Sequence, residues 1–343
     1  PSFSRDCAIQ DRYRAVRETF RKYKKDVTDV NEYKALRFID RQKWERDGIT
    51  KEMPPKFIYQ PAPSTWYIWE GGIQSLFPSD KGAGRLAEMI RNNTFNNSYF
   101  SMVNKVLLTN GVVSVKDKVS DQTIKEGEIR TSFRSAPGYC SYDSYSETRR
   151  NLSRVKESVS AYQSEWEKKA QISFKEMIKQ LGGLSSSKAS MVPDMLISGH
   201  PCPWDCNGNF VFYASSRDVL NNLDWMQIFV RYNLQRYENS NPVVSPIELA
   251  AIVQKWLVSV HPFADGNGRT SRAVQDLILQ NFDLPFAPGG DLQEDALVDV
   301  QPYIELTYQK TEEMMTVLEN CAQELKEAKK ISYSCQATAI LNK

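Results

Sequence analysis

The sequence is poor in the features that define several classes of protein. It has six cysteines and two histidines in 343 residues. The cysteines are scattered along the chain rather than arranged as in a small disulfide scaffold, which fits a reduced cytosolic setting. No apolar run approaches the roughly 20 residues that span a bilayer, and the first thirty residues are charged and lack the apolar core of a signal peptide. We therefore expect no membrane span, and a location in the cytoplasm or, after delivery, in the cytosol of a host cell.

Charge of one sign is not in excess either. Lysine and arginine number 44 and aspartate and glutamate 42, for a formal net charge of +2. This balance argues against nucleic acid as a general partner. The basic run Arg21–Lys25 lies on an expected helix and is typical of a solvated face. With 41% hydrophobic and 25% charged residues the composition is that of an ordinary globular protein, and the length allows two domains.

One stretch of twelve residues, 261–272, concentrates polar chemistry between two apolar helices. It reads HPFADGNGRTSR. Apolar residues recur at helical spacing from Pro246 to Val260 before it and from Ala273 to Phe282 after it. The stretch therefore joins the end of one core helix to the start of the next, where a rigid scaffold can hold a site.

The start of the second helix has the residues of an anion site. Gly266 and Gly268 permit a tight turn and let a ligand approach the backbone, and the first N–H groups of a helix lack intrahelical partners. Arg269 and Arg272 are three residues apart, face the same way, and can bind phosphate through bidentate hydrogen bonds. Asp265 is a hard oxygen ligand suited to a magnesium ion shared with phosphates.

His261 is the candidate proton acceptor of this stretch. The ordinary histidine pKa of about 6.5 suits it to take a proton from a hydroxyl near neutral pH. A structural interpretation of each residue alone stays open, because DGNG is a common turn, Asp265 can cap a helix and His261 can be a core histidine. The whole set in this order favours activation of a hydroxyl beside a metal-bound nucleotide.

The run HPFADGNGR resembles the signature of Fic-domain proteins, HPFx(D/E)GNGR, at every specified position. Arg272 supplies the further arginine of the adenylyl-transferring members. The resemblance implies a mainly α fold, a Fic-type helical bundle with a small β-hairpin flap, here with a mostly helical N-terminal extension. It also implies transfer of AMP from ATP to a Ser, Thr or Tyr hydroxyl of a target protein, with ATP and Mg²⁺ required and self-modification open.

The resemblance implies a role for each residue of the loop. His261 would be the general base and Asp265 would hold Mg²⁺. The α-phosphate would lie against Asn267, Gly268 and the neighbouring backbone, and the two arginines would hold the β- and γ-phosphates. The implied nucleotide-binding set is Gly266, Asn267, Gly268, Arg269 and Arg272.

The complete GNGR run favours nucleotidyl transfer over the kinase-like and phosphocholine-transferring branches, which alter the loop. It says little about which base the nucleotide carries. Two alternatives stay open. One is a phosphodiesterase that removes AMP from a protein, or a transferase of another phosphate-linked group. The other is a non-catalytic scaffold that only holds nucleotide.

The resemblance further implies a flap that pins the backbone of the target by strand pairing. Residues 208–214 form a β-prone run after the turn 205–208, with Phe210, Val211 and Phe212 as the candidate flap residues. Addition of a strand at its edge would position a target with little regard for its sequence. An ordinary hairpin that covers the core is the alternative.

Many members carry an inhibitory helix with the pattern (S/T)xxxE(G/N). Ser153 and Glu157 are the upstream candidates, although Ser158 departs from the expected Gly or Asn. Thr316–Asn320 has the Glu–Asn pair but is one residue short. Absence of internal inhibition stays open. A zinc site at His200–Cys206 is disfavoured, because a second pair of ligands at suitable spacing is missing.

The rest of the chain is divided by its helical patterns. Helices are expected over 1–26, 84–92, 98–108, 147–181, 218–237 and 300–330, and short strands or loops over 111–115 and 129–133. A break near Gln171 is an alternative to one long helix. Residues 50–80, rich in Pro, Gly and aromatics, are expected to form loops or a partner surface. We expect an extension of unknown role (1–145), a helical connector (146–190), a catalytic domain (191–330) and a tail (331–343).

Overall fold

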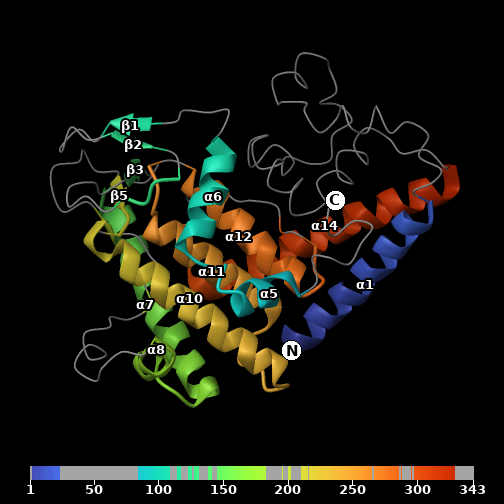
Figure 1. The fold of residues 1–343 in the computed structure, drawn as a ribbon, viewed down its shortest axis with the longest axis horizontal. Helices are drawn as coiled ribbons and strands as arrows, with labels where there is room; N and C mark the ends of the chain where they lie inside the picture. The colour runs from blue at the N-terminus through green and yellow to red at the C-terminus, as the bar shows by residue number, and fades with distance from the viewer. Residues whose placement is uncertain are drawn as a thin grey trace. The chain divides into compact units, whose positions relative to one another are not determined.

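The computed structural model describes residues 2–23, 84–108, 114–116, 123–125, 127–130, 138–140, 145–182, 195, 200–201, 210–214, 216–264, 266–285, 287, 295 and 297–328. The described part is mainly helical, as expected (Figure 1). The expected partner surface at 50–80 and the tail lie outside it.

The chain divides into two compact units, each drawn from distant parts of the sequence. Unit 1 comprises Pro1–Glu88, Gln275–Gly289 and Thr307–Lys343. Unit 2 comprises Met89–Val274 and Gly290–Leu306, and it contains the loop 261–272. Three helices contribute residues to both units: α5 (Arg85–Arg91), α12 (Asn267–Asn281) and α14 (Val300–Ala328).

Unit 2 is built around α11 (Pro246–Val260), which is buried along almost its whole length. Its start is set by Ser245, whose side-chain oxygen accepts a hydrogen bond from the Glu248 N–H, and by Pro246 in the first turn. A helix that is apolar all round must be surrounded by other elements. The expected helix was therefore predicted correctly, both in its bounds and in its burial.

Aromatic side chains join α11 to the helices that surround it. These are α7 (Tyr145–Ala170), α8 (Phe174–Gly182) and α10 (Ser216–Glu238). The Phe229 ring on α10 lies 5.3 Å from Trp166 on α7 and 5.6 Å from Trp256 on α11. Phe174 on α8 contacts the same Trp256 ring at 5.8 Å. Aromatic pairs at such distances add to the area that they bury, so this chain of rings fixes four helices to one another.

The expected helix 147–181 is two helices. Gln171 lies between them with φ of 57°, in the left-handed region that ends a helix. Ser173 then accepts a hydrogen bond from the Glu176 N–H and starts α8. The alternative of a break near Gln171 is confirmed. The helix α6 (Asn97–Leu108) of the same unit also has the expected bounds to within a residue.

Two small antiparallel sheets complete the described part of unit 2. One pairs β1 (Ser114–Lys116) with β2 (Thr123–Lys125). The other has the order β3-β5-β4, with β3 at Gly138–Cys140, β4 at His200–Pro201 and β5 at Phe210–Phe212. Of the short strand or loop expected at 129–133, the first two residues form a loop, and the Arg130 N–H donates to the Pro262 carbonyl at 2.8 Å.

Unit 1 contains α1 (Ser2–Tyr23) beside the C-terminal part of α14, and the two helices run in parallel (Figure 1). Arg5 pairs with Glu312 at 2.9 Å, and seven residues later Arg12 pairs with Glu319 at 2.7 Å. The apolar side chains of α1, among them Ile9, Tyr13 and Val16, are buried. The amphipathic helix expected at the start of the chain is confirmed.

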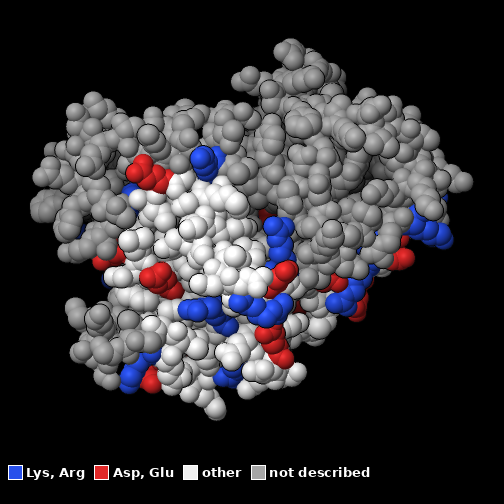
Figure 2. Space-filling model, viewed as in Figure 1, with Lys and Arg blue, Asp and Glu red and all other residues white. Residues whose placement is uncertain are grey.

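The surface of the described residues is mixed in character. On the face in Figure 2 acidic and basic side chains are interspersed around an uncharged stretch over α6. Met102, a residue of α6, is 52% exposed. None of the described helices combines the length and apolar character that crossing a bilayer requires.

Candidate functional site

The site is the joint between α11 and α12. His261 ends α11 in the left-handed conformation, with φ 51° and ψ 57°, and its N–H donates to the Leu257 carbonyl at 3.1 Å. A left-handed residue after the last turn reverses the chain and satisfies a helix-end carbonyl. The backbone conformation therefore fixes the position of His261 at the C-terminal end of α11.

Asn267, the first residue of α12, closes the loop. Its Oδ1 accepts from the Phe263 N–H and its Nδ2 donates to the Phe263 carbonyl, both at 2.8 Å. Phe263 is fully buried, so the loop is anchored in the core. Because the oxygen and the nitrogen of the Asn267 side-chain amide both bind Phe263, this side chain shapes the loop. The donors available to an anion are then the backbone N–H groups that start α12.

The two glycines of the loop have different reasons to be glycine. Gly266 has φ of 74°, a conformation that strains other residues. Gly268 is helical, but a Cβ there would lie 3.2 Å from both terminal nitrogens of Arg272. The absent side chain at 268 thus makes room for the Arg272 guanidinium next to the first turn of α12.

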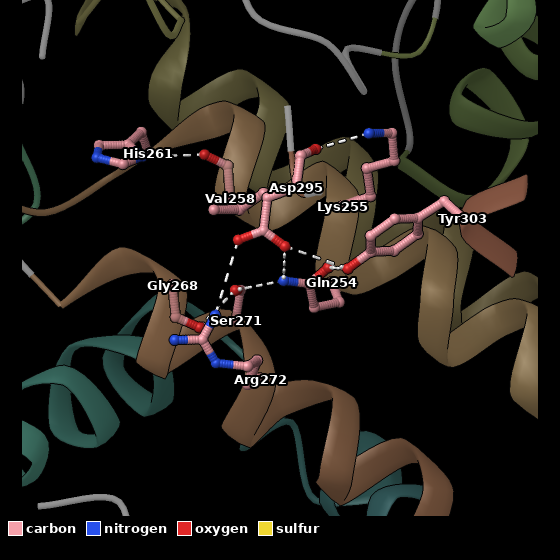
Figure 3. Close-up of polar contacts among 9 residues, drawn as sticks. All are labelled: Gln254, Lys255, Val258, His261, Gly268, Ser271, Arg272, Asp295 and Tyr303. Atoms are coloured by element: carbon pink, nitrogen blue, oxygen red, sulfur yellow. Dashed lines mark hydrogen bonds and ion pairs between the residues drawn. The ribbon is translucent and has the colours of Figure 1, made fainter. Parts of the chain in front are cut away.

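The His261 ring is held in one orientation by two contacts. Its Nδ1 lies 3.0 Å from the Val258 carbonyl (Figure 3). Its ring also stacks on Tyr213, with centroids 3.8 Å apart and 7° between the planes. A carbonyl can only accept, so Nδ1 carries the proton and Nε2 presents its lone pair. Burial lowers the His261 pKa to about 3, so the neutral form is favoured.

Arg130 ties together the segments around His261. Its guanidinium donates to the carbonyls of His261 at 2.5 Å, Val260 at 2.8 Å and Ala214 at 2.5 Å. The side chain is buried, and burial lowers its pKa to about 10. Carbonyls at a helix C-terminus carry partial negative charge, which compensates a buried cation there.

The short sheet reaches this joint through the residues that follow β5. The Ala214 N–H donates to the Ser259 carbonyl at 3.2 Å, and Tyr213 carries the ring that stacks on His261. Phe210–Phe212, the candidate flap residues, pair with β3 on one side and with β4 on the other. The edges of this sheet are thus β3 and β4, and strand addition at β5 itself would have to displace one of them.

Arg272 contacts a buried carboxylate that was not predicted. One of its terminal nitrogens lies 3.7 Å from Asp295 Oδ2 (Figure 3). Asp295 Oδ1 accepts from Gln254 Nε2 at 3.0 Å and from the Tyr303 hydroxyl at 3.3 Å. The buried Lys255 donates to the Asp295 carbonyl at 2.6 Å, and burial lowers its pKa to about 8.

The other predicted residues are placed only in part. Asp265 lies outside the described residues, and Arg269 is in the first turn of α12 with its side chain outside them. Ser153 and Glu157 are exposed on α7. The deviating Ser158 accepts a hydrogen bond from the Val300 N–H at 3.1 Å, which gives it a structural role at the start of α14.

Sequence reasoning missed Arg130, Tyr213 and Asp295. Gln254 and Lys255 offered a signal, because two long polar residues in the middle of an otherwise apolar helix need buried partners. Nothing local marks Arg130, which lies 131 residues before His261. As for a metal, no three His, Cys, Asp or Glu side chains gather within the part of the chain that the structure describes.

Comparison with known proteins places this joint in a family. A model of the Fic/DOC family matches residues 212–279. Protein adenylyltransferase fic-1 of Caenorhabditis elegans is 48% identical over 48 residues, which are 14% of this chain and 9% of that protein. The uridine 5'-monophosphate transferase of Xanthomonas campestris pv. campestris (strain 8004) is 43% identical over 54 residues, 16% of this chain and 10% of its own.

A Fido domain-containing protein of Dictyostelium discoideum is 40% identical over 55 residues, 16% of this chain and 38% of that protein. The chain thus spans from about a tenth to two fifths of the length of these curated relatives. The family model covers the joint between α11 and α12, and each of these relatives matches only 14–16% of this chain. The match to the Fic/DOC family model includes His261 and the loop that follows it.

Proposed function

We propose that this protein transfers AMP from ATP to the hydroxyl of a Ser, Thr or Tyr side chain of a target protein. The observation that carries the proposal is the orientation of His261. Its Nδ1 is bound to the Val258 carbonyl, which leaves the Nε2 lone pair as the proton acceptor of a residue that stands at the start of the loop leading into α12. A fixed neutral imidazole next to an anion-binding helix end suits the removal of a hydroxyl proton beside a bound phosphate.

In the proposed reaction the hydroxyl oxygen of the target attacks the α-phosphorus of ATP. The bond between the α-phosphorus and the bridging oxygen breaks, and pyrophosphate leaves with the bonding electrons. His261 Nε2 takes the hydroxyl proton. The products are a phosphodiester between AMP and the target, and pyrophosphate.

The residues that would hold the nucleotide follow from the same joint. The backbone N–H groups of Gly268 and its neighbours would bind the α-phosphate. Arg269 and Arg272 would bind the β- and γ-phosphates. Mg²⁺, held by Asp265 and by phosphate oxygens, would neutralise charge on the leaving pyrophosphate.

The target would dock near the sheet that precedes His261. Tyr213 and Ala214 connect β5 to the His261 joint, so a segment bound at the β3 or β4 edge would lie close to the histidine. Main-chain pairing at such an edge would accept many target sequences.

The test is incubation of the purified chain and lysate proteins with Mg²⁺ and ATP labelled at the α-phosphate. Covalent label on the chain itself or on lysate proteins is expected, and ATP labelled at the γ-phosphate should give none. His261→Ala should lower the labelling rate by about 100-fold or more. Equal labelling by the variant, or label from the γ-phosphate, would refute the proposal. Release of AMP from a previously modified protein would instead identify a phosphodiesterase.

A second candidate is transfer of UMP, which is favoured by the likeness to the uridine 5'-monophosphate transferase of Xanthomonas campestris. The residues around His261 contact phosphate in the proposed complex and do not select the base. The same assay with UTP labelled at the α-phosphate, at equal concentration, decides between the two nucleotides.

A further inference from the structure

A polar network behind Arg272 extends the candidate site into the core of unit 2. It links α11, α12, Asp295 and the start of α14 (Figure 3). Asp295 is 1% exposed and Gln254 is also 1% exposed. Buried polar groups cost free energy unless they bind one another, so a network of this kind is retained where its geometry serves a purpose.

Asp295 is held rigidly by its neighbours. Gln254 and Tyr303 donate to its carboxylate, and the Lys255 ammonium donates to its main-chain carbonyl. The same Tyr303 hydroxyl also contacts Gln254 Oε1, and the Lys255 nitrogen lies 4.9 Å from the centre of the Tyr303 ring. Because both its side chain and its backbone are held, Asp295 presents a negative charge at a fixed point.

Arg272 needs such a charge to remain where it is. It lies in the first turns of α12, where the helix dipole opposes a cation, and it is 13% exposed. Ser271 Oγ, which accepts from Gln254 Nε2 at 3.1 Å and donates to the Gly268 carbonyl at 2.8 Å, joins the network to the loop. The carboxylate of Asp295, 3.7 Å from a terminal nitrogen of Arg272, offsets the unfavourable dipole.

We propose that Asp295 is a positioning residue that holds the Arg272 guanidinium beside Gly268 for the β- and γ-phosphates of the nucleotide. The proposal rests on the proposed function, because it assumes that a nucleoside triphosphate binds at this joint. Asp295 does not touch the nucleotide and acts through Arg272. It follows that the effect of Asp295 depends on phosphates that AMP lacks.

The test measures the dissociation constants of Mg-ATP and of AMP by calorimetry. Asp295→Asn keeps the size of the side chain but removes its charge. It should weaken Mg-ATP binding about tenfold and leave AMP binding within about twofold. In kinetics the KM for ATP should rise more than kcat falls. Unchanged Mg-ATP binding would overturn the proposal. Tighter Mg-ATP binding would overturn it as well, because it would mean that Asp295 competes with phosphate for Arg272.

Three further variants separate positioning from general loss of structure. Combined with Arg272→Ala, Asp295→Asn should add nothing to the loss that Arg272→Ala causes alone, whereas additive losses would contradict action through Arg272. Asp299→Asn is the matched control, because Asp299 pairs with Arg154 at 2.8 Å near the surface. It should leave both affinities unchanged.

Tyr303→Phe removes only the hydroxyl that contacts Asp295 and Gln254. It should weaken Mg-ATP binding in the same direction as Asp295→Asn, by about threefold. If Tyr303→Phe weakens AMP and Mg-ATP equally, the network only maintains the fold and the proposal is wrong. If the unaltered protein binds no Mg-ATP, the proposed function fails, and that result is distinct from a failure of the Asp295 variants.

Discussion

At the scale of single residues, the pKa of His261 lies well below that of an ordinary histidine. Burial is the main cause of the low pKa, the charge of Arg130 acts in the same direction, and the hydrogen bond to Val258 opposes both. The group is therefore neutral in the folded protein at pH values where it is half-protonated in the unfolded chain. The base form is therefore present near neutral pH without a deprotonation step, but the lowered pKa makes the imidazole a weaker proton acceptor than an ordinary histidine.

This predicts a pH dependence that nuclear magnetic resonance can follow directly. Between the folded pKa of about 3 and the ordinary value of 6.5 the unfolded state binds more protons. The stability that neutral His261 contributes is therefore complete above pH 6.5 and is lost as the pH falls toward 3. Imidazole ¹⁵N spectra should show His261 as the Nδ1–H tautomer down to about pH 5, with His261→Ala used for assignment. Titration of His261 near 6.5 would contradict this prediction.

At the scale of elements, Arg130 connects the end of α11 with the residues that follow β5. Three carbonyls accept from one guanidinium, and its own N–H donates to the Pro262 carbonyl. Removal of the guanidinium leaves these buried carbonyls without that donor, which costs about 1–3 kcal/mol for each group that finds no replacement.

Arg130→Met should therefore lower the free energy of unfolding by about 2–4 kcal/mol. Urea unfolding measures this difference. Arg150→Met on the exposed face of α7 is the matched control and should change stability by less than about 0.5 kcal/mol. If the two variants have equal stability, Arg130 does not hold the joint, and the orientation of His261 must depend on Tyr213 and Val258 alone.

The elements also show what the sequence could and could not predict. The bounds of α10, α11 and α12 follow from apolar periodicity. His261 stands out because two glycines and two arginines follow it within the same stretch of twelve residues. Asp295 could not be found in this way, since its contact with Gln254 spans 41 residues and depends on how the chain returns after α12. The break at Gln171 lacks a glycine or proline, and was predictable only as an alternative to a continuous helix.

At the scale of the whole molecule, the candidate site belongs to one compact unit, and the paired parts of α1 and α14 belong to the other. The loop 261–272 lies within unit 2, whereas α1 and its ion-pair partners Glu312 and Glu319 lie within unit 1. A ligand that binds at the loop should therefore protect a defined part of the chain.

Mg-ATP at 100 times its dissociation constant should stabilise the protein by about 2.7 kcal/mol, which raises the melting temperature by several degrees. Hydrogen exchange followed by mass spectrometry should show slower exchange in peptides that cover 258–274, where backbone N–H groups meet the phosphates. Peptides from α1 should exchange at the same rate with and without nucleotide. Arg272→Ala should reduce both the rise in melting temperature and the protection. Protection confined to α1, or a melting temperature that Mg-ATP leaves unchanged, would place the nucleotide elsewhere or exclude it.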